Sequence, residues 1–367
     1  MNLYVGLMSG TSMDGIDAAL LELPSNRLIY GITKQYSNDV KKRLDDLIIS
    51  KNLTLASICQ LNTLIGREFA ETTNQLLHDT KISPREIQAI GSHGQTVCHD
   101  TSGSIPYTLQ LGCAHTISSL TRITVVADFR TRDLVNGGQG APFAPLYHQK
   151  IFSSKINDDV AVVNIGGIAN ITFISAQETT TGWDVGPGNC LMDAWIYQNE
   201  GKLFDENGAW AGKGEVIPIL LEQLLQDPFF NLASPKSIGK EYFSLSWLHN
   251  YLKRDYKPVD IQATLLALTA HSIAGAILNT PNKVKELYLC GGGAHNRQLI
   301  KALDYLLANI EVKSIAELGI SPDYLEAMMF AWLAEQTIKQ IPVNLASITG
   351  SKDIAILGAI YPMIKSY

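Results

Sequence analysis

Two glycines and two aspartates, residues suited to binding phosphate and metal ions, fall within nine positions near the N-terminus, in the stretch SGTSMDGID (residues 9–17). Glycine lets the backbone approach a ligand closely, and the N–H and hydroxyl groups of such a stretch can bind phosphate oxygens. Carboxylates at 14 and 17 could hold Mg²⁺ directly or through water. The alternative is an ordinary hairpin with glycine in its turn. The phosphate-binding candidates are Gly10, Thr11, Ser12, Met13, Asp14, Gly15, Ile16 and Asp17, of which Asp14 and Asp17 are also the candidate metal ligands.

This first stretch does not match the two common nucleotide-binding fingerprints. The chain contains no GxxxxGK[ST] sequence, and the stretch leads into a second apolar run, residues 16–23, that we interpret as a strand. A dinucleotide-binding fingerprint requires a helix at that point. The sequence therefore predicts a phosphate-binding turn between two strands.

Two further glycine turns lie in the second half of the chain. The stretch NIGGIAN (164–170) joins two expected strands, and CGGGAHN (290–296) separates an expected strand at 286–289 from a helix-like stretch. In the second case a flat ring or a phosphate could lie against bare backbone at a helix N-terminus. The alternatives are a plain hairpin and a tight strand-to-helix turn. The candidates in these turns are Asn164, Gly166, Gly167, Gly291, Gly292 and Gly293.

One carboxylate is a candidate general base. Asp184 precedes the turn VGPGN, which leads into an expected helix over 190–198 with Asn189 as its N-cap and Asp193 in its first turn. A carboxylate fixed beside a rigid turn could face a cleft and accept a proton. The alternative is an aspartate that caps the turn.

Other polar candidates follow strands or open a helix. The stretches GSHGQT (91–96) and DFRTRD (128–133) each come after an expected buried strand, which is where α/β proteins bind ligands. Asp128 and Arg130 suit an anionic or polyhydroxyl substrate, or form a structural ion pair. The spacing of His93 and His99 matches no standard metal site, so we expect hydrogen-bonding roles for them. Glu326 faces the cleft or caps a helix that begins around Pro322. The substrate candidates are His93, Gln95, Asp128, Arg130 and Glu326.

Strand and helix signals alternate along the whole chain, which predicts an α/β fold. The expected strands are 3–7, 16–23, 89–91, 124–127, 160–165, 169–174 and 286–289; helical periodicity covers 40–78, broken near 51–55, and 326–340. Each half begins with a strand, a glycine turn and a second strand, which indicates a duplicated architecture. The glycine-rich segment 136–141 is either the boundary between the halves or an active-site loop.

Composition excludes several classes of protein. The 367 residues suggest two domains, and 46% hydrophobic with 17% charged residues argues against disorder. A net charge of −6 without a basic run argues against a nucleic-acid partner. The longest apolar stretch, Ala263 to Leu278, falls short of a membrane span of about 20 residues, so we expect no membrane helix.

The N-terminus and the cysteines indicate a cytoplasmic protein. No Lys or Arg precedes Arg27, so the basic region of a signal peptide is missing. The five cysteines are spread along the chain without a CxxC pair, which predicts reduced thiols rather than a disulfide framework or a zinc site.

Taken together, the two strand-turn-strand loops and the late glycine turn resemble the actin-like ATPase domain shared by sugar kinases, actin and Hsp70-type chaperones. More specifically, the motifs GLMSGTSMDGIDAAL, GSHGQTV, DFRTRDLVNGGQGAP, NIGGIANIT, DVGPGN and LCGGGAHN, in this order, resemble the anhydro-N-acetylmuramic acid kinase family. The resemblance runs from Val5 to Tyr361, and its first and third motifs are long enough to be highly specific.

This resemblance implies a two-domain, actin-like ATPase (ribonuclease H-like) α/β fold with the active site in the interdomain cleft. We expect residues 1–135 plus about 345–367 to form the N-terminal domain, and residues 136–344 to form the C-terminal domain. The family resemblance also suggests a homodimer.

The implied reaction uses ATP and Mg²⁺. The family's enzymes open the anhydro ring of 1,6-anhydro-N-acetylmuramic acid with water and phosphorylate O6, giving N-acetylmuramate 6-phosphate and ADP during peptidoglycan recycling. Carried onto this sequence, residues 10–17 and 164–167 are the two phosphate loops, and residues 291–293 lie near the nucleotide base. Asp184 matches the catalytic carboxylate.

The sequence departs from the family pattern at two positions beside this carboxylate. Val185 stands where we expect Thr, which puts a hydrogen-bonding role there in doubt, and Trp183 stands where we expect Phe. The rival functions are a kinase of the same fold that acts on another sugar, a chaperone-like or actin-like ATPase, and a non-catalytic sugar sensor.

Overall fold

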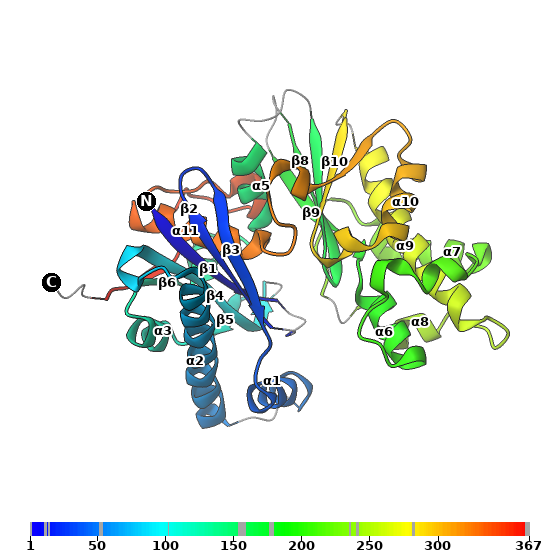
Figure 1. Ribbon diagram of the computed structural model, residues 1–367. Helices are drawn as coiled ribbons and strands as arrows, with labels where there is room; N and C mark the ends of the chain where they lie inside the picture. The colour runs from blue at the N-terminus through cyan, green and yellow to red at the C-terminus, as the bar shows by residue number, and fades with distance from the viewer. Residues whose placement is uncertain are drawn as a thin grey trace. The chain divides into compact units, whose positions relative to one another are not determined.

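The computed structural model in Figure 1 describes residues 2–10, 13, 15–50, 54–101, 103–152, 159–175, 180–234, 236–239, 242–280 and 283–363, without the side chains of 49 and 50. The chain divides into two compact units. Unit 1 comprises Met1–Ala144 and Tyr324–Tyr367, and unit 2 comprises Pro145–Asp323. Relative to the domain limits expected from the sequence, unit 1 also contains residues 136–144 and 324–344. The glycine-rich segment 136–141 thus lies inside unit 1.

Unit 1 contains a mixed sheet with the strand order β12-β6-β4-β1-β2-β3, in which β5 pairs with β4. β1, β2 and β3 pair antiparallel with one another, whereas β4 runs parallel to both β1 and β6. The strands are β1 (Leu3–Ser9), β2 (Ile16–Glu22), β3 (Arg27–Lys34), β4 (Ile87–Asp100), β5 (Tyr107–Leu111), β6 (Val125–Ala127) and β12 (Ala359–Tyr361).

Six α-helices of unit 1 accompany this sheet: α1 (Asn38–Ser50), α2 (Leu55–Thr80), α3 (Ala114–Thr121), α4 (Phe129–Val135), α11 (Leu325–Ile338) and α12 (Ala346–Thr349). α11 packs on β1 and β4. Gly6 and Gly91 are paired across these two strands, and a Cβ on either would overlap a backbone carbonyl of α11, that of Ala327 or of Phe330. The two glycines therefore allow the helix to lie directly on the sheet, which is why residues 324–344 belong to unit 1.

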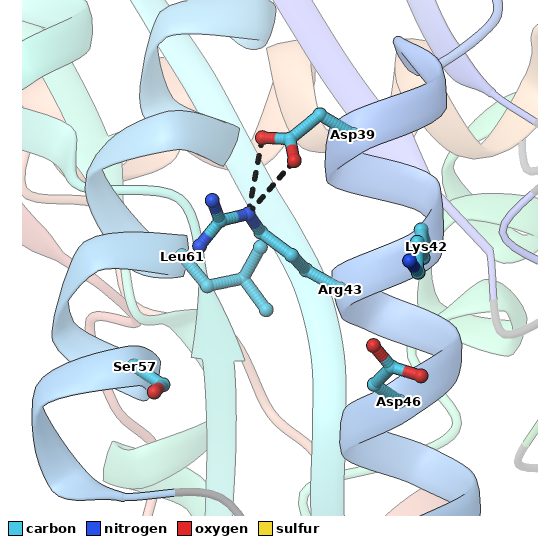
Figure 2. A pocket seen from close by; sticks show the side chains of 6 residues that line it. All are labelled: Asp39, Lys42, Arg43, Asp46, Ser57 and Leu61. Atoms are coloured by element: carbon cyan, nitrogen blue, oxygen red, sulfur yellow. Dashed lines mark hydrogen bonds and ion pairs between the residues drawn. The ribbon is translucent and has the colours of Figure 1, made fainter.

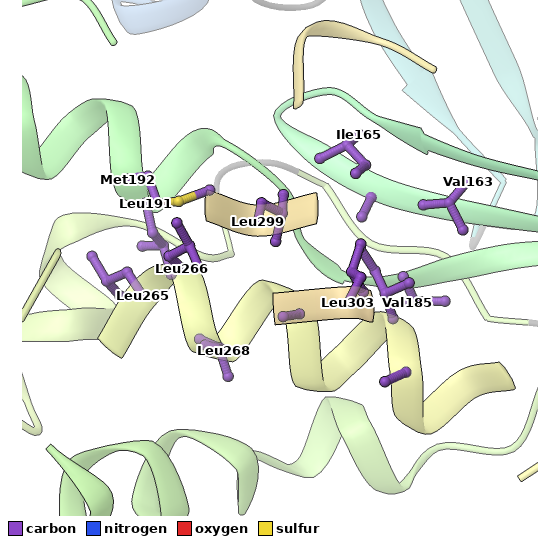
Figure 3. Close-up of a cluster of buried hydrophobic side chains, with 14 of the residues drawn as sticks. Val163, Ile165, Val185, Leu191, Met192, Leu265, Leu266, Leu268, Leu299 and Leu303 are labelled. Carbon is purple, nitrogen blue, oxygen red and sulfur yellow. The ribbon is translucent and has the colours of Figure 1, made fainter. Parts of the chain in front are cut away.

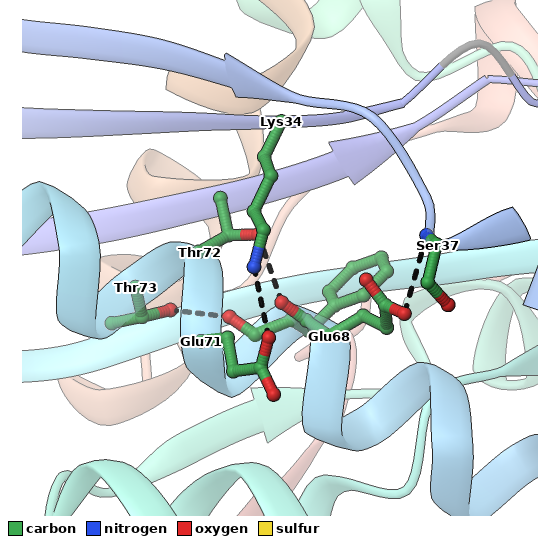
Figure 4. A network of polar contacts seen from close by, with 7 residues as sticks. Lys34, Ser37, Glu68, Glu71, Thr72 and Thr73 are labelled. Atoms are coloured by element: carbon green, nitrogen blue, oxygen red, sulfur yellow. Dashed lines mark hydrogen bonds and ion pairs between the residues drawn. The ribbon is translucent and has the colours of Figure 1, made fainter.

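A polar network joins β3 to α2 (Figure 4). Lys34 Nζ donates to Glu71 Oε2 at 2.8 Å, and the backbone N–H of Ser37 donates to Glu68 Oε1 at 3.3 Å. Glu68 is largely buried, and its backbone carbonyl accepts from Thr72. The network therefore fixes the segment that follows β3, which carries Tyr36 toward the first glycine loop.

Unit 2 repeats the strand pattern. Its sheet has the order β11-β10-β7-β8-β9, with β7, β8 and β9 antiparallel and with β10 parallel to β7 and β11. The strands are β7 (Val160–Ile165), β8 (Ile168–Ile174), β9 (Thr181–Pro187), β10 (Glu286–Cys290) and β11 (Glu311–Ser314). The longer helices are α5 (Ala144–Phe152), α6 (Cys190–Glu200), α7 (Pro218–Leu225), α8 (Leu245–His249), α9 (Pro258–Leu278) and α10 (Arg297–Leu306).

Each unit thus contains three antiparallel strands followed by parallel strands, as expected for the duplicated α/β architecture of the actin-like ATPase fold. The predicted fold class is confirmed. The sequence analysis did not anticipate β3, β5, β9, β11 and β12. The late helix also begins at Leu325 rather than near Pro322, because residues 322–324 form a turn before it.

Buried apolar side chains form a separate core in each unit. Figure 3 shows part of the core of unit 2, in which Val163 and Ile165 of β7 and Val185 of β9 lie near leucines of α9 and α10. α9 is 21 residues long, and its apolar window has a mean hydropathy of 1.6, so by length and composition it could cross a membrane. The expectation that this stretch is too short was therefore wrong. However, 78% of that window is buried inside the protein.

Candidate active site

The turn between β1 and β2 contains the first group of candidates. Thr11, Ser12 and Asp14 lie outside the described residues. Met13 donates its N–H to the carbonyl of Gly10 at 3.1 Å, has a positive φ of 58°, and buries its side chain in the core of unit 1. Ile16 is also fully buried. These two side chains therefore anchor the turn. Met13 and Ile16 can contact a ligand through their backbone groups.

Three side chains hold the two ends of this turn together. Ser9 Oγ, at the end of β1, lies 2.8 Å from the carbonyl of Gly15 and 2.7 Å from Gln95 Oε1. Gln95 Nε2 donates to the carbonyl of Gly10 at 3.1 Å, and the Tyr36 hydroxyl lies 3.4 Å from Gln95 Oε1. Gln95 has no exposed surface. The sequence predicted Gln95 as a substrate residue. In the structure its side chain bonds to Ser9 and Gly10 and so supports the turn.

His93 and Arg130 form a second polar contact in unit 1. Arg130 Nε donates to His93 Nε2 at 2.9 Å, and Arg130 Nη1 donates to the carbonyl of Gly140 at 3.0 Å. Because Nε2 accepts this hydrogen bond, the neutral imidazole carries its proton on Nδ1. Burial, with the charge of Arg130 adding to it, holds the pKa of His93 well below its usual range. The imidazole is therefore a permanent acceptor at neutral pH.

The carboxylate of Glu326 interacts with this arginine and with a second carboxylate, that of Asp17. Burial and the charge of Asp17 raise the pKa of Glu326, whereas Arg130 lowers it. Burial lowers the pKa of Arg130 to about 10, against the opposing effect of Glu326, so it remains charged at neutral pH. Asp17 Oδ1 accepts from Thr33 Oγ1 at 2.6 Å. The structure therefore brings Asp17, His93, Arg130 and Glu326 into one polar cluster of unit 1.

Asp128 is not part of this cluster through any contact among the described residues. It is exposed, has a φ of 59°, and accepts from Thr131 Oγ1 at 2.5 Å. The sequence analysis missed the buried Asp133, whose carboxylate accepts from the N–H of Gly140 at 2.7 Å and from Thr349 Oγ1 at 2.8 Å. These bonds fix the loop that supplies the Gly140 carbonyl to Arg130.

In unit 2 the second glycine turn is held by the chain that follows β9. The N–H groups of Gly188 and Asn189 donate to the carbonyls of Gly167 and Gly166 at 2.9 and 2.8 Å. Asn189 Nδ2 donates to the carbonyl of Ile165 at 3.1 Å. Asn189 occupies the N-cap position of α6 as expected, but its side chain makes no capping bond because the amide is used on the turn.

The late glycine turn lies against the same place. β10 is parallel to β7, and Cys290 is paired with Asn164 at the ends of these strands. Gly291 has a φ of 74°, and a Cβ there would overlap Asn164 Oδ1. The glycines lead into a 3₁₀ turn (Gly292–His295), after which Asn296 caps α10. Residues 164–167, 188–189 and 291–293 therefore form one cradle of bare backbone in unit 2.

Asp184 lies within β9, which continues to Pro187, so residues 185–187 are strand where the sequence analysis expected the turn after Asp184. Its Oδ2 accepts from the N–H of Ile238 at 2.9 Å and from Ser237 Oγ at 3.1 Å. Burial raises the pKa of this carboxyl, and the two hydrogen bonds oppose the shift. A carboxylate with a raised pKa is a stronger base than an ordinary aspartate, which suits proton transfer.

The residues on either side of Asp184 explain the two departures from the family pattern. Val185 is 3% exposed and packs in the core of unit 2 (Figure 3), so an apolar side chain suits its place. The Trp183 ring lies 5.0 Å from that of Phe173, between centroids, on the neighbouring strand.

A pocket of about 290 Å³ lies elsewhere in unit 1, between α1 and α2 (Figure 2). The residues that line it are Asp39, Lys42, Arg43, Asp46, Ser57 and Leu61. None of them is a candidate site residue, and Arg43 is paired with Asp39 on the surface of α1. This pocket therefore contains none of the residues of the polar cluster of unit 1 or of the glycine cradle of unit 2.

Comparisons with known proteins agree with the motifs. A family model described as anhydro-N-acetylmuramic acid kinase matches residues 2–363. The chain belongs to this family. A family member from Legionella pneumophila (strain Paris), named anhydro-N-acetylmuramic acid kinase, is 78% identical over the full length of both chains. One from Coxiella burnetii with the same name is 46% identical, covering 98% of this chain and 97% of its own.

Solved structures with similar folds are more distant in sequence. The activator of the 2-hydroxyisocaproyl-CoA dehydratase from Clostridium difficile, with bound ADPNP, has a TM-score of 0.47 and 13% identity, covering 92% of this chain and 96% of its own. A ROK family glucokinase from Streptomyces griseus, in complex with glucose and AMPPNP, has a TM-score of 0.42 and 10% identity, covering 91% and 100%.

Proposed function

We propose that this kinase opens the anhydro ring of 1,6-anhydro-N-acetylmuramic acid with water and phosphorylates O6 with ATP. The products are N-acetylmuramate 6-phosphate and ADP. The observation that carries the proposal is a family match over residues 2–363, supported by a partly buried, hydrogen-bonded Asp184 at the position to which the resemblance assigns the catalytic carboxylate. An ordinary sugar kinase uses its base on a free hydroxyl, whereas here the base acts on water.

Asp184 is the general base in this reaction. Its carboxylate accepts a proton from the water whose oxygen bonds to C1 of the sugar. The C1–O6 bond breaks, and its electron pair goes to O6. O6 then bonds to the γ-phosphorus of ATP while the bond to the leaving ADP oxygen breaks. The proton therefore ends on Asp184 and returns to solvent after product release.

The glycine cradle of unit 2 and the first loop of unit 1 bind the nucleotide. Residues 10–17 and 164–167 hold the phosphates through backbone N–H groups, and residues 291–293 lie near the base. Preorganised N–H donors stabilise the negative charge that develops on the transferred group without having to reorient, which is the main source of catalysis in phosphoryl transfer.

Mg²⁺ suits the carboxylates of unit 1. Asp17 and Glu326 are close enough for their charges to interact, and Mg²⁺ is usually held by one or two carboxylates together with substrate phosphates and water. Asp17, with Asp14, would hold the ion directly or through water, and the ion would neutralise charge on the phosphates.

The polar cluster of unit 1 binds the sugar. Arg130 supplies a fixed positive charge for an anionic substituent, and Glu326 accepts hydrogen bonds from hydroxyl or amide groups. His93 and Gln95 support these contacts, and Asp128 is the most exposed of the substrate candidates. We further propose that the enzyme is a cytoplasmic homodimer that serves peptidoglycan recycling.

The experiment is mass spectrometry of the product formed from 1,6-anhydro-N-acetylmuramic acid and Mg-ATP in ¹⁸O-labelled water, with a short quench to limit exchange. We expect a phosphorylated sugar with one label in its anomeric hydroxyl. An unlabelled product that keeps the anhydro ring would identify an ordinary hydroxyl kinase. ATP hydrolysis without a sugar product would favour the chaperone-like alternative.

A further inference from the structure

The two oxygens of the Asp184 carboxylate are in different situations. Oδ2 accepts both hydrogen bonds, from the Ser237 hydroxyl at 3.1 Å and from the Ile238 N–H at 2.9 Å. Oδ1 accepts no hydrogen bond from any of the described residues. One donor is a side chain that a substitution can remove, and the other is backbone. The carboxylate is thus held by one oxygen.

The segment that supplies both donors is itself fixed at several points. The N–H of Asp184 donates to the carbonyl of Lys236 at 2.9 Å, so β9 continues its pairing into this segment. Lys236 Nζ donates to the carbonyls of Phe229 and Phe230 at 2.9 and 3.2 Å and lies 4.5 Å from the centre of the Phe229 ring. The ammonium therefore ties this segment to the 3₁₀ turn at Pro228–Asn231.

A buried carboxylate on the other side completes the support. Asp227 accepts from the N–H of Phe229 at 2.9 Å, from the Tyr242 hydroxyl at 3.0 Å and from Trp247 Nε1 at 2.8 Å. It ties together the two ends of the segment that holds Ser237. The segment that carries the Ser237 hydroxyl is therefore held by bonds that do not involve the side chain of Asp184.

We propose that Ser237 is a positioning residue for Asp184: its hydroxyl, with the Ile238 N–H, occupies Oδ2 and leaves Oδ1 to accept the proton of the attacking water. The inference rests on the proposed function. The Ser237 side chain is exposed, and its bond to Asp184 is the one side-chain hydrogen bond it makes among the described residues, so it contributes little to the core. Its role is to fix the direction in which the base presents its free oxygen.

Besides burial, the two hydrogen-bond donors are the groups that shift the pKa of Asp184, although several charged residues lie on or near the elements around β9. The elements packed against β9 are β8, α9 and the 3₁₀ turn at Pro228–Asn231. Their titratable groups, with those just outside them, are Asp260 and His271 of α9, Asp227 and Lys236. The pKa of Asp184 responds to burial, which raises it, and to the bonds from Ile238 and Ser237, which lower it. Loss of the hydroxyl therefore raises this pKa further.

The test compares Ser237→Ala, Ser237→Thr and the control Ser234→Ala in the full-length enzyme. Ser234 is an exposed serine of the same segment that makes no contact with Asp184. We expect Ser237→Ala to lower kcat about ten-fold, since a hydrogen bond to a charged group is lost, with the KM for sugar and ATP nearly unchanged. The acidic limb of its kcat/KM profile moves to higher pH. Ser237→Thr restores both, and Ser234→Ala behaves as wild type.

Wild-type kcat and an unmoved acidic limb in Ser237→Ala would overturn the inference, as would a loss confined to KM or a Ser237→Thr variant that restores nothing. If Ser237→Ala does not fold, Ser237→Cys replaces it, with intermediate values expected and wild-type values contradicting the proposal. Asp184→Asn separates the two proposals. An active Asp184→Asn refutes the proposed general base, whereas an inactive one beside a normal Ser237→Ala refutes this inference alone.

Discussion

The turn between β1 and β2 and the turn between β7 and β8 follow the same strand pattern but are held by different groups. In unit 1 the turn covers residues 10–15, and its ends are joined by the side chains of Ser9 and Gln95. In unit 2 the turn is Gly166 and Gly167, held mainly by backbone N–H groups from the chain after β9. The first turn thus depends on which side chains are present, and the second on backbone bonds from the chain after β9, where a Cβ on Gly188 would overlap the carbonyl of Gly166.

The difference extends to the chemistry beside each turn. Unit 1 brings together groups of opposite charge, the carboxylates of Asp17 and Glu326 and the guanidinium of Arg130. This combination suits the binding of a cation and a polar sugar. Unit 2 offers a neutral backbone cradle and, at the candidate site, the partly buried carboxylate of Asp184. We infer that the charged groups of unit 1 hold the cation and the sugar, and that unit 2 supplies a backbone cradle for the nucleotide and the base that activates the water.

Among the variants considered, Asp184→Asn should have the largest effect on activity. Removal of the general base is expected to lower kcat at least about 10³-fold while the KM for ATP changes little. Burial raises the pKa of Asp184, so its charged form costs the folded state free energy at neutral pH, and the uncharged amide should not lower the free energy of unfolding. Steady-state kinetics and urea unfolding at pH 7 measure both quantities.

The control for this variant is Asp255→Asn, an exposed aspartate of the same unit, which should match wild type in both measurements. Turnover by Asp184→Asn within ten-fold of wild type would contradict the assignment of the base to unit 2.

Gly291→Ala tests whether the second cradle depends on bare backbone. The added Cβ would overlap Asn164 Oδ1 and lie 2.9 Å from the carbonyl of Ile165, and the φ of 74° adds strain of about 1–3 kcal/mol. The shifted cradle should lower kcat/KM for ATP by about 10²-fold, since small misplacements at a reacting centre have large effects. Binding of ATP by calorimetry and kinetics with varied ATP test this.

The matched substitution is Gly275→Ala in α9, where a Cβ meets nothing within 4 Å. It should keep normal activity and gain up to about 1 kcal/mol of stability from the better helix propensity of alanine. Equal effects of the two substitutions would mean that the close approach at Gly291 is unimportant.

Gln95→Met tests the side-chain support of the first turn. Methionine has a similar shape but makes no hydrogen bonds to Ser9 or Gly10, and each buried polar group left without a partner costs about 1–3 kcal/mol. The looser turn should raise the KM for ATP about ten-fold and change kcat less. Gln88→Met, at an exposed position of the same strand, is the control. A purely stabilising role for Gln95 would lower the unfolding free energy without the change in KM.

These regions also differ in how far the sequence predicts them. The strand Val160–Ile165 was predicted with its observed bounds, since a continuous apolar run ends there at two glycines. β9 was missed because Gly186 and Pro187 signal a turn, although an edge strand tolerates both. Ser237 could not be predicted, since it lies far from Asp184 in sequence and its partner at 238 acts through a backbone N–H that any residue would supply.

Gln95 shows a further limit. Its residue type suits a substrate contact and a buried support equally well, and only the three-dimensional positions of Ser9 and Gly10 distinguish the two roles. The residue type thus predicted that Gln95 would make polar contacts. Which groups it contacts depends on the pairing of β1 with β4, two strands that are distant in sequence.

The smallest expected effect concerns the stability of the two units in mild acid. Burial lowers the pKa of His148 in unit 2 to about 3 and that of His93 in unit 1 well below 6.5. The unfolded chain binds protons at these positions near pH 6.5, and the folded chain does not, so the free energy of unfolding falls as the pH drops through that value. At pH 6 the loss is about 0.8 kcal/mol for each histidine.

His148→Gln isolates one of these contributions without touching the polar cluster of unit 1. Glutamine does not titrate and can keep a hydrogen bond to Thr172, which His148 Nδ1 contacts at 2.9 Å. Urea unfolding of both proteins at pH 8 and pH 6 should show that the variant loses about 0.8 kcal/mol less than wild type over this interval. An equal loss would mean that His148 becomes protonated in the folded protein and that burial does not hold its pKa down.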